Sequence, residues 1–463
     1  MHLHILGICG TFMGGIAAIA QRAGHIVTGC DSNVYPPMSS QLEALGIALT
    51  QGFEASQLDG PAKAADVFVV GNVVSRGNPL LEAILDRGLH YTSGPQWLAE
   101  HVLREKWVLA VAGTHGKTTT SAMLAHIVDR AGLQPGFLIG GVPVDFGVSA
   151  RHSDSAFFVI EADEYDTAFF DKRAKFVHYR PRTLVINNIE YDHADIYPDI
   201  DAILWQFHQL VRTVPGNGLI VANGRDANVD KLRARGVWTP VQTFSAHGEA
   251  DLTAAYESIG ERSNFGVKRR GDRLGSVLWR LLGDHNLENA LAALAAALHV
   301  GVPADVALVA LGEFSGVKRR LEKRGEFAGI ALFEDFAHHP TAIATTLAGL
   351  RSRGTAKRIV AVMEPRSNTM RMGVHRDTLA ASFAGADRLF VLGGDDSRWD
   401  VAAAFAPLGG KASVAANVDE LLVALLAELR AGDHVVLMSN GGFQGLPLNL
   451  QRALEQRAQH GGA

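Results

Sequence analysis

The sequence predicts an α/β protein built from three domains. Short apolar runs of strand length alternate with helical stretches along the chain, and 49 glycines are available for the turns between them. A length of 463 residues suits about three domains, and a hydrophobic fraction of 47% allows each domain its own core. The strand, turn and helix pattern restarts near residues 107 and 314, which predicts domains at residues 1–106, 107–313 and 314–463.

The composition argues against several classes of protein. A formal net charge of −5 does not favour a broad nucleic-acid-binding surface. Cys9 and Cys30 are too few for a disulfide scaffold and favour a reducing compartment. No basic and apolar leader opens the chain, and no uncharged apolar run is long enough to cross a bilayer; residues 290–300 are predicted to form a buried helix. We therefore expect a cytoplasmic protein that binds neither membranes nor nucleic acid.

A glycine-rich turn joins the first predicted strand, residues 3–8, to a predicted helix, residues 16–23. A second strand, residues 26–30, ends at Asp31, about twenty positions after the glycines. This order is typical of sites that place a nucleotide diphosphate on a helix N-terminus and its ribose on a carboxylate. Cys9 replaces the middle glycine of GxGxxG, so a turn without ligand, capped by Asp31, stays an alternative. The candidate binding residues are Gly7, Gly10, Thr11, Gly14, Asp31 and Ser32.

A polar loop, residues 72–79, follows another predicted strand at residues 66–71. Open α/β sheets bind ligands beyond the carboxyl ends of their strands. Asn72 and Ser75 are therefore further candidates for the same ligand.

The strongest motif lies between a predicted strand, residues 107–112, and a predicted helix. It is GTHGKTTT: Gly113, Thr114, His115, Gly116, Lys117, Thr118, Thr119 and Thr120. Glycines in such a loop turn backbone N–H groups toward phosphate oxygens, Lys117 supplies a charge, and the Thr118 hydroxyl can hold Mg²⁺. Val111 replaces the first glycine of GxxxxGK[ST], so the motif is a shortened variant, and a glycine turn without ligand is the alternative. The motif predicts a nucleoside triphosphate site.

Acidic residues follow two more predicted buried strands. Residues 157–166 carry Glu161 to a strand end, and a strand at residues 183–188 leads to His193 among acidic residues. Carboxylates so placed suit Mg²⁺, which usually lies between one or two carboxylates and substrate phosphates. A lone histidine is more often structural, but beside a phosphate cradle and Glu161 we interpret His193 as a metal ligand.

Six motifs, in this order, resemble the Mur ligases, ATP-dependent amide-forming enzymes of peptidoglycan metabolism. They are GTHGKTTT, EADEYD, NNIEYDHADIY, GDHNLENA, GVKRRLE and EDFAHHPTAI, between residues 113 and 343. The resemblance implies a Rossmann-like N-terminal domain that binds a UDP-sugar and a central P-loop ATPase domain with a mostly parallel sheet. It also implies a Rossmann-like C-terminal domain that carries the amine substrate.

The resemblance further implies roles for single residues. Lys117 would hold the β- and γ-phosphates of ATP, Thr118 and Glu161 would hold one Mg²⁺, and Glu161 with His193 would hold a second. Other ATP contacts would come from His285, Asn286 and Asn289 near the adenine and, from the C-terminal domain, Arg320 and Asp335, with His338 nearby. Without the resemblance, residues 318–320 would be interpreted as a solvated charge run.

Several Mur ligases place a carbamoylated lysine at the second metal ion, shortly after the motif that contains the histidine. This chain has no lysine between Lys175 and Lys231, so that device is absent. The absence points to the branch that adds L-alanine to UDP-N-acetylmuramate, or to its close relative.

The loop after a predicted strand at residues 358–363 distinguishes the L-alanine-adding branch from its close relative. Its sequence is EPRSNTMRMG, and the PRS core resembles the loop with which family members recognise diaminopimelate. A guanidinium fork also matches a carboxylate in its own right. Residues 35–39 (YPPMS) and 439–443 (SNGGF) resemble the same tripeptide-joining relative. The candidate peptide-binding residues are Arg366, Ser367, Asn368 and Arg371, with a solvated loop arginine as an equal alternative for Arg371.

The implied activity joins the tripeptide L-Ala-γ-D-Glu-meso-diaminopimelate to UDP-N-acetylmuramate through an acyl phosphate, in peptidoglycan recycling, with ATP and two Mg²⁺ ions. An L-alanine ligase is the nearest alternative. A folate- or cyanophycin-type ligase would leave the N-terminal domain without a purpose. A non-catalytic sugar-nucleotide sensor is the alternative from another class, and Lys117, Thr118, Glu161 and His193 together argue against it. The expected partners are small molecules, and the chain is expected to be a monomer or a weak homodimer.

Overall fold

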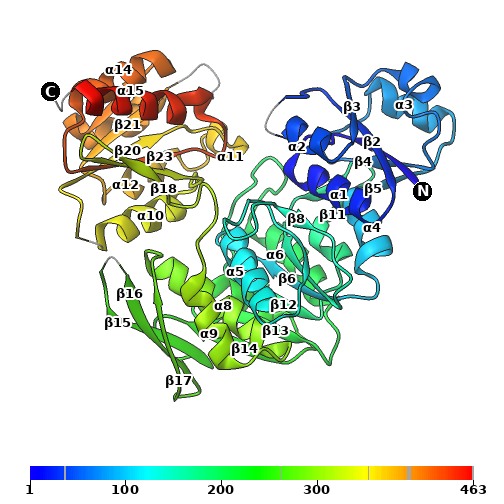
Figure 1. The fold of residues 1–463 in the computed structure, drawn as a ribbon, viewed down its shortest axis with the longest axis horizontal. Coiled ribbons are helices and arrows are strands. Elements are labelled where there is room, and N and C mark those ends of the chain that lie inside the picture. Colours follow the sequence, from blue (N-terminus) through cyan, green and yellow to red (C-terminus); the bar gives the residue numbers. More distant parts are fainter. Residues whose placement is uncertain (36–37, 261, 353, 394–397, 461–463) are drawn as a thin grey trace.

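The computed structural model describes residues 1–35, 38–260, 262–352, 354–393 and 398–460. These residues form three lobes, each built on its own large sheet (Figure 1). The middle lobe, cyan to green, lies at the bottom of the view, and the N-terminal lobe (blue) and the C-terminal lobe (yellow to red) stand above it on opposite sides. Pro36 and Pro37 of the segment at 35–39 lie outside the described residues.

The central strands are buried on both faces. In β6 (Trp107–Ala112), alternate residues from Val108 pack in one core, and Leu109 and Val111 pack in another. β20 (Arg358–Met363) divides its side chains between two cores in the same way. Strands of this kind are continuous apolar runs in the sequence, which is why they could be predicted.

The N-terminal sheet is parallel throughout, with the strand order β3-β2-β1-β4-β5. Its first helix begins at Thr11, earlier than the expected residue 16. Gly14 and Gly15 lie inside this helix because neighbours pack closely on it; a Cβ on Gly15 would lie 2.3 Å from Leu138 Cδ1. The elements are β1 (His2–Leu6), α1 (Thr11–Arg22), β2 (Ile26–Asp31), α2 (Met38–Ala44), β3 (Ala48–Gln51), η1 (Ala55–Asp59), β4 (Val67–Val70), α3 (Pro79–Asp86), β5 (Tyr91–Ser93), α4 (Gly94–Leu98) and η2 (Ala99–Leu103).

The middle sheet has the strand order β17-β16-β15-β14-β13-β12-β6-β9-β7-β8. Its centre is parallel, as expected, up to β15, and the pairs β15–β16 and β16–β17 extend one edge in antiparallel order. The helices α5 and α8 pack against each other and against this sheet. After β6, the elements are α5 (Lys117–Arg130), β7 (Gly136–Leu138), β8 (Ala150–Arg151), β9 (Phe157–Ala162), β10 (Asp166–Ala168), β11 (Asp171–Ala174), η3 (Lys175–His178), β12 (Thr183–Ile186), α6 (Ile200–Val211), β13 (Leu219–Asn223), α7 (Ala227–Ala234), β14 (Val241–Ser245), β15 (Leu252–Ser258), β16 (Ser263–Arg269), β17 (Asp272–Trp279), α8 (Asp284–His299) and α9 (Ala304–Glu313).

The C-terminal sheet has the order β18-β19-β23-β20-β21-β22, and only the edge strand β18 is antiparallel to its neighbour. Besides β20, the elements are β18 (Glu322–Phe327), β19 (Ile330–Asp335), α10 (Pro340–Ser352), α11 (Asn368–Arg371), α12 (Arg376–Ser382), β21 (Arg388–Leu392), α13 (Val401–Phe405), η4 (Ala406–Lys411), β22 (Ala412–Ala415), α14 (Val418–Glu428), β23 (Asp433–Met438), η5 (Phe443–Gly445) and α15 (Leu446–His460).

The apolar core continues from the N-terminal lobe into the middle lobe. Ile16 and Leu98 belong to the same buried cluster as Ala110 and Phe158. The C-terminal lobe instead has two cores of its own, to which the middle lobe adds Leu282. The first two lobes are therefore packed as one body more firmly than the third lobe is packed against them.

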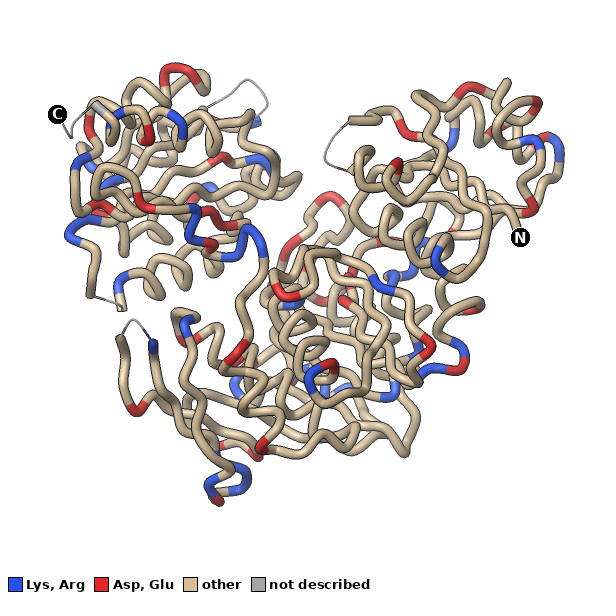
Figure 2. The backbone as a smooth tube through the Cα atoms, in the orientation of Figure 1, with Lys and Arg blue, Asp and Glu red and all other residues tan. Residues whose placement is uncertain are grey.

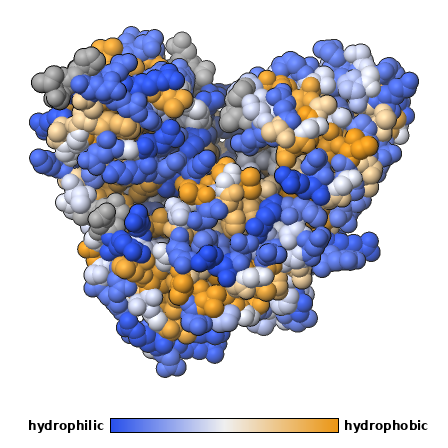
Figure 3. Space-filling model, in the orientation of Figure 1, coloured by the Kyte–Doolittle hydropathy of each residue, from blue (hydrophilic) through white to orange (hydrophobic). Residues whose placement is uncertain are grey.

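Acidic and basic residues are interspersed along the chain in all three lobes, as the backbone tube shows (Figure 2). Within the described residues, no helix combines the length and the apolar character needed to cross a membrane. The space-filling view shows a notch between the two upper lobes, above the middle lobe (Figure 3).

Candidate active site

Three strand ends bring the candidate residues together. β6 pairs in parallel with β9 on one side and with β12 on the other. The register sets Val111 beside Glu161 and Ala112 beside Ile186, so the chain leaves all three strands at the same edge. The glycine loop, Glu161 and the loop at residues 187–197 therefore meet there, as the sequence predicts.

The glycine loop has the backbone that a phosphate cradle needs. Gly116 has φ +79°, and a Cβ there would lie 2.3 Å from Asn289 Oδ1, so only glycine fits without a shift. The backbone N–H of Thr114 donates to the Asn188 carbonyl (3.0 Å), and that of His115 donates to Asn188 Oδ1 (2.7 Å). The cradle is thus tied to the loop that follows β12.

Lys117, the first residue of α5, is buried among carboxylates. Its Nζ lies 2.8 Å from Glu164 Oε2 and 3.7 Å from Asp163 Oδ1, and it donates to the Gly113 carbonyl (2.7 Å). Burial alone would lower the pKa of Lys117, but the charges of Glu164 and Asp163 hold it above its usual value. Lys117 is therefore a fixed positive charge at the mouth of the cradle.

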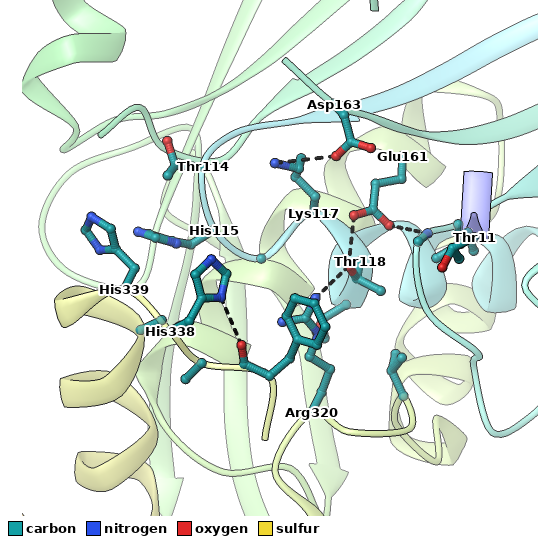
Figure 4. A pocket seen from close by; sticks show the side chains of 18 of the residues that line it. Thr11, Thr114, His115, Lys117, Thr118, Glu161, Asp163, Arg320, His338 and His339 are labelled. Atoms are coloured by element: carbon teal, nitrogen blue, oxygen red, sulfur yellow. Dashed lines mark hydrogen bonds and ion pairs between the residues drawn. The ribbon is translucent and has the colours of Figure 1, made fainter. Parts of the chain in front are cut away.

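Thr118 and Glu161 form an oxygen-rich pair on neighbouring elements (Figure 4). The Thr118 hydroxyl donates to Glu161 Oε1 (2.9 Å), and the Gly140 N–H donates to Glu161 Oε2 (2.6 Å). Burial, and then the charge of Asp163, raise the pKa of Glu161. A buried carboxylate next to a hydroxyl and a phosphate cradle fits Mg²⁺.

The carboxylate that orients the His193 ring is Glu164, and a metal site shared by Glu161 and His193 remains a prediction. His193 Nε2 lies 3.1 Å from Glu164 Oε1 and 3.8 Å from Asp192 Oδ2. Burial lowers the pKa of His193, but the hydrogen bond and charge of Glu164 more than offset this and raise it. Among the residues that the structure describes, no hydrogen bond or ion pair joins His193 to Glu161. Glu164 therefore links Lys117 to His193.

The C-terminal lobe reaches the cradle through residues 319–339. Arg320 Nη2 donates to the Thr118 hydroxyl (3.0 Å), as Figure 4 shows. Asp335 is buried, and its carboxylate accepts from the N–H groups of Leu321 (2.6 Å) and Ala337 (2.8 Å). His338 Nε2 lies 4.0 Å from Asp192 Oδ2 across the boundary between the lobes.

Arg319 corrects the expectation of a solvated charge run. Its guanidinium donates to Glu334 Oε1 (2.7 Å) and to the Ser439 carbonyl (2.8 Å). The sequence could not show this because Ser439 is distant in the chain and approaches only when β19 pairs with β23.

A histidine and carboxylate cluster not identified from the sequence closes the same boundary. Glu190 Oε2 lies 3.2 Å from His115 Nε2 and 3.4 Å from His339 Nδ1, and it accepts from the Thr341 hydroxyl (2.7 Å). Burial would raise the pKa of Glu190, but its bond to His115 and the neighbouring charges lower it to about 2. The cluster ties the phosphate cradle to the beginning of α10.

The first turn of α8 offers a buried nitrogen to a ligand. His285 Nδ1 is buried and has no hydrogen-bond partner in the described structure, and burial lowers the pKa of His285 to about 4. Asn286 donates to the Leu282 carbonyl (2.7 Å), and Asn289 accepts from the Thr120 hydroxyl (3.1 Å). An unpartnered neutral imidazole beside the cradle fits a nucleotide base.

A cavity of about 1120 Å³ connects these groups, with lining residues from all three lobes. The expected residues that line it are Gly7, Gly10, Thr11, Asp31, Ser32, Asn72, Thr114, His115, Gly116, Lys117, Thr118, Thr119, Glu161, His193, His285, Asn286, Asn289, Arg320, Asp335 and His338. Gly14, Ser75 and Gly113 do not line it: Gly14 lies inside α1, Ser75 is exposed, and Gly113 presents its carbonyl to Lys117.

Asp31 closes the N-terminal glycine turn. Its Oδ2 accepts from the Cys9 N–H (2.9 Å) and its Oδ1 accepts from the Asn33 N–H (3.2 Å). The carboxylate also lines the cavity. Asp31 therefore has the turn-capping role that the sequence left open, and a ligand contact remains a prediction.

The loop of candidate peptide-binding residues lies outside the cavity lining but contacts the His193 loop. Ser367 caps α11 by accepting from the Met370 N–H (3.3 Å). Asn368 donates to Asp195 Oδ2 (2.8 Å), and the Thr369 hydroxyl donates to Asp192 Oδ1 (2.8 Å). The Arg366 side chain is 44% exposed, and its Nη1 lies 3.8 Å from Glu364 Oε1. The Arg366 guanidinium is thus partly open to solvent, and Arg371 ends α11.

A first prediction concerns the charge of Glu164. The pKa of Glu164 is about 2, below its ordinary value of 4.5. Burial alone would raise this pKa, but the charge of Lys117 and the hydrogen bond from His193 outweigh burial and lower it. A lowered carboxylate pKa stabilises the fold above pH 4.5 by about 3 kcal/mol, and this is lost as pH falls toward 2. We expect Glu164→Gln to lower the melting temperature at pH 7 and the difference from wild type to shrink below pH 4.5. Calorimetry at pH 7 and pH 3 checks this, and a difference independent of pH would contradict it.

The fold and site define a class: a nucleoside triphosphate cradle, with an oxygen-ligand pair suited to Mg²⁺, at the meeting point of three α/β lobes. Three family models match the chain: "Mur ligase family, catalytic domain" at residues 2–106, "Mur ligase middle domain" at residues 111–297 and "Mur ligase, glutamate ligase domain" at residues 319–441. The chain belongs to the Mur ligase family, whose members are ATP-dependent amide ligases. The resemblance and the three-domain α/β prediction are confirmed.

Individual relatives are similar over most of the chain or nearly all of it. The UDP-N-acetylmuramate--L-alanyl-gamma-D-glutamyl-meso-2,6-diaminoheptandioate ligase of Escherichia coli (strain K12) is 51% identical over 99% of both chains. The crystal structure of a murein peptide ligase from Psychrobacter arcticus 273-4 matches with a TM-score of 0.76 and 44% identity, covering 98% of this chain and 99% of that one. A UDP-N-acetylmuramate--L-alanine ligase of Desulforapulum autotrophicum is 34% identical over 84% of this chain and 83% of its own.

Proposed function

We propose that this chain joins the tripeptide L-alanyl-γ-D-glutamyl-meso-diaminopimelate to UDP-N-acetylmuramate, with ATP as the energy source, in peptidoglycan recycling. One observation carries the choice of acceptor: the chain is 51% identical to a ligase named for this tripeptide and 34% identical to a relative named for L-alanine. Arg366, exposed beside the His193 loop, supports it, because a guanidinium can bind the distal carboxylate of diaminopimelate.

The reaction requires activation of a carboxylate, because a carboxylate repels nucleophiles and has no good leaving group. A lactyl carboxylate oxygen attacks the γ-phosphorus, the bond to the β-phosphate oxygen breaks, and ADP leaves. The tripeptide amine then attacks the acyl carbon, and phosphate departs from the tetrahedral intermediate with one of the original carboxylate oxygens. The amine loses a proton in this step.

The protein supplies charge and position. Lys117, which is paired with Glu164 and Asp163, would bind the β- and γ-phosphates of ATP. Thr118 and Glu161 would hold Mg²⁺, which neutralises phosphate charge, and His193 would help to hold a second ion. His285, Asn286 and Asn289 would contact the adenine side, and Arg320, Asp335 and His338 would approach from the C-terminal lobe.

The substrate assignments follow the lobes. Residues 1–106 would bind the UDP-sugar, with the α1 N-terminus at Gly10 and Thr11 facing the diphosphate. Residues 107–313 would bind ATP, and residues 314–463 would bind the peptide. Because the C-terminal lobe has cores of its own, closure of this lobe over the other two is a feasible step of the cycle.

The proposed setting is the cytoplasm, supported by two free thiols at Cys9 and Cys30. The proposed partners are the three small-molecule substrates alone, with the chain as a monomer or a weak homodimer.

Transfer of an isotope tests the acyl-phosphate route. With ¹⁸O in the lactyl carboxylate of UDP-N-acetylmuramate, we expect released phosphate to carry one ¹⁸O for each amide formed, because the acyl C–O bond breaks. Mass spectrometry of the phosphate checks this. Unlabelled phosphate released together with amide would rule out the route, and absence of amide with either acceptor would favour a sensor.

A further inference from the structure

Lys175 is a buried cation that the proposed mechanism does not use. It follows the β10–β11 hairpin, and its backbone N–H donates to the Tyr165 carbonyl (2.9 Å). The side chain lines the cavity, yet the residue is only 6% exposed. Lys175 Nζ lies 4.7 Å from the centre of the Phe12 ring and 5.2 Å from that of the Tyr165 ring. Two aromatic faces from two lobes therefore flank this ammonium group.

The acidic residues near Lys175 are occupied by other cations. Asp163 and Glu164 are paired with Lys117, and Asp166 is paired with the exposed Lys172 (2.6 Å). In the described part of the chain, no hydrogen bond or ion pair reaches the Lys175 ammonium. Burial lowers the pKa of Lys175, although the neighbouring carboxylates oppose this.

A buried charge of this kind is costly unless something compensates it, and aromatic faces do so only in part. The cavity is the direction from which a compensating anion can come. The ammonium group therefore indicates an anionic oxygen of a ligand rather than a structural partner.

The neighbours of Lys175 indicate which anion this is. Phe12 stands in the first turn of α1, next to Thr11, where the diphosphate of the sugar nucleotide is proposed to lie. The Tyr165 ring also contacts the His193 ring, with 4.4 Å between the ring centres and a tilt of 60° between the ring planes. Lys175 thus lies between the proposed diphosphate position and the metal-binding side of the ATP cradle. The carboxylate that must reach the γ-phosphate has to pass between these two places.

We infer that the Lys175 ammonium binds the lactyl carboxylate of the acyl substrate and holds it beside the ATP cradle, an inference that rests on the proposed function. Its positive charge offsets the repulsion between the carboxylate and the γ-phosphate before the P–O bond forms. The carboxylate in turn compensates the charge of the buried ammonium group. Lys175 therefore favours the binding of a sugar nucleotide that carries the lactyl group.

Two sugar nucleotides that differ by the lactyl group provide the test. UDP-N-acetylmuramate has the carboxylate, and UDP-N-acetylglucosamine lacks it. Calorimetric titration without ATP or peptide gives their Kd values for wild type, for Lys175→Met and for Lys172→Met, whose side chain in wild type is 70% exposed. We expect Lys175→Met to raise the Kd for UDP-N-acetylmuramate about 10- to 100-fold and to leave that for UDP-N-acetylglucosamine unchanged. Lys172→Met should change neither value.

The melting temperature separates binding from structure. Because Lys175→Met removes a buried charge and keeps the apolar stem, it should not lower the melting temperature of the free protein; Lys175→Gln serves as a second variant if the first does not fold. If Lys175→Met raised the Kd values for both sugar nucleotides equally, Lys175 would bind the diphosphate or have a structural role, and the inference would be overturned. Unchanged binding of both would overturn it as well. If wild type binds neither sugar nucleotide, the proposed function fails together with the inference.

Discussion

Lys117→Ala is expected to lower kcat by about 10²- to 10³-fold, equivalent to about 3–4 kcal/mol of transition-state stabilisation. The structure places the Lys117 ammonium group at the start of α5, where it is paired with Glu164 and Asp163. The next residue, Thr118, forms the oxygen-rich pair with Glu161. Without the Lys117 ammonium group, the charge that develops on the transferring phosphoryl group loses its nearest fixed cation. Phosphate release at saturating ATP, sugar nucleotide and tripeptide measures the loss.

The control for this variant is Lys172→Ala, which removes an exposed lysine of the same lobe. Among the described residues, Lys117→Ala also leaves Glu164 with His193 as its one remaining ion-pair partner, so the melting temperature should fall. Circular dichroism must show that the protein remains folded at the assay temperature. A folded Lys117→Ala protein with turnover within threefold of wild type would contradict the assignment of the cradle.

Arg366→Ala is expected to reduce kcat/KM for the tripeptide about 10- to 100-fold, because a charge-assisted, bidentate contact with a carboxylate is lost. The KM for ATP should not change, since Arg366 does not line the cavity. Arg366→Lys should recover only part of the activity because an ammonium cannot reproduce the fork. Initial rates at varied tripeptide give these values.

Arg376→Ala is the matched control, since Arg376 is an exposed arginine of the same lobe, paired only locally with Asp377 (3.4 Å). It should leave tripeptide kinetics unchanged. An unchanged kcat/KM in Arg366→Ala, or an equal loss in both variants, would remove Arg366 from the peptide site.

The sheets and the strand ends could be predicted because they depend on local pattern. β6 and β20 have the expected bounds, since each is an apolar run closed by polar or glycine residues. The start of α1 could not be predicted, because Gly14 and Gly15 are usually turn residues. They lie in a helix here, where Met38 and Leu138 pack so closely that a larger side chain would require these neighbours to shift.

The sequence predicts which motifs meet at the site, but it does not predict which side chains pair with one another there. Lys117, Thr118, Glu161 and His193 meet as their strand ends require. Which carboxylate orients His193 depends on how the chain turns after β9, and the structure assigns this to Glu164. Lys175 follows the charged run Asp171 to Arg173 and resembles a surface residue in the sequence. In the structure, Phe12 from another lobe and Tyr165 pack against its ammonium group.

The central claim is that the acceptor is the tripeptide, and one comparison tests it most directly. Purified enzyme with ATP, Mg²⁺ and UDP-N-acetylmuramate receives either the tripeptide or free L-alanine, and phosphate release and amide product are followed together. We expect the tripeptide to give the higher kcat/KM by at least about 10-fold, the effect of one good charge-assisted contact. Faster turnover with L-alanine would contradict the account and identify the chain as an L-alanine ligase.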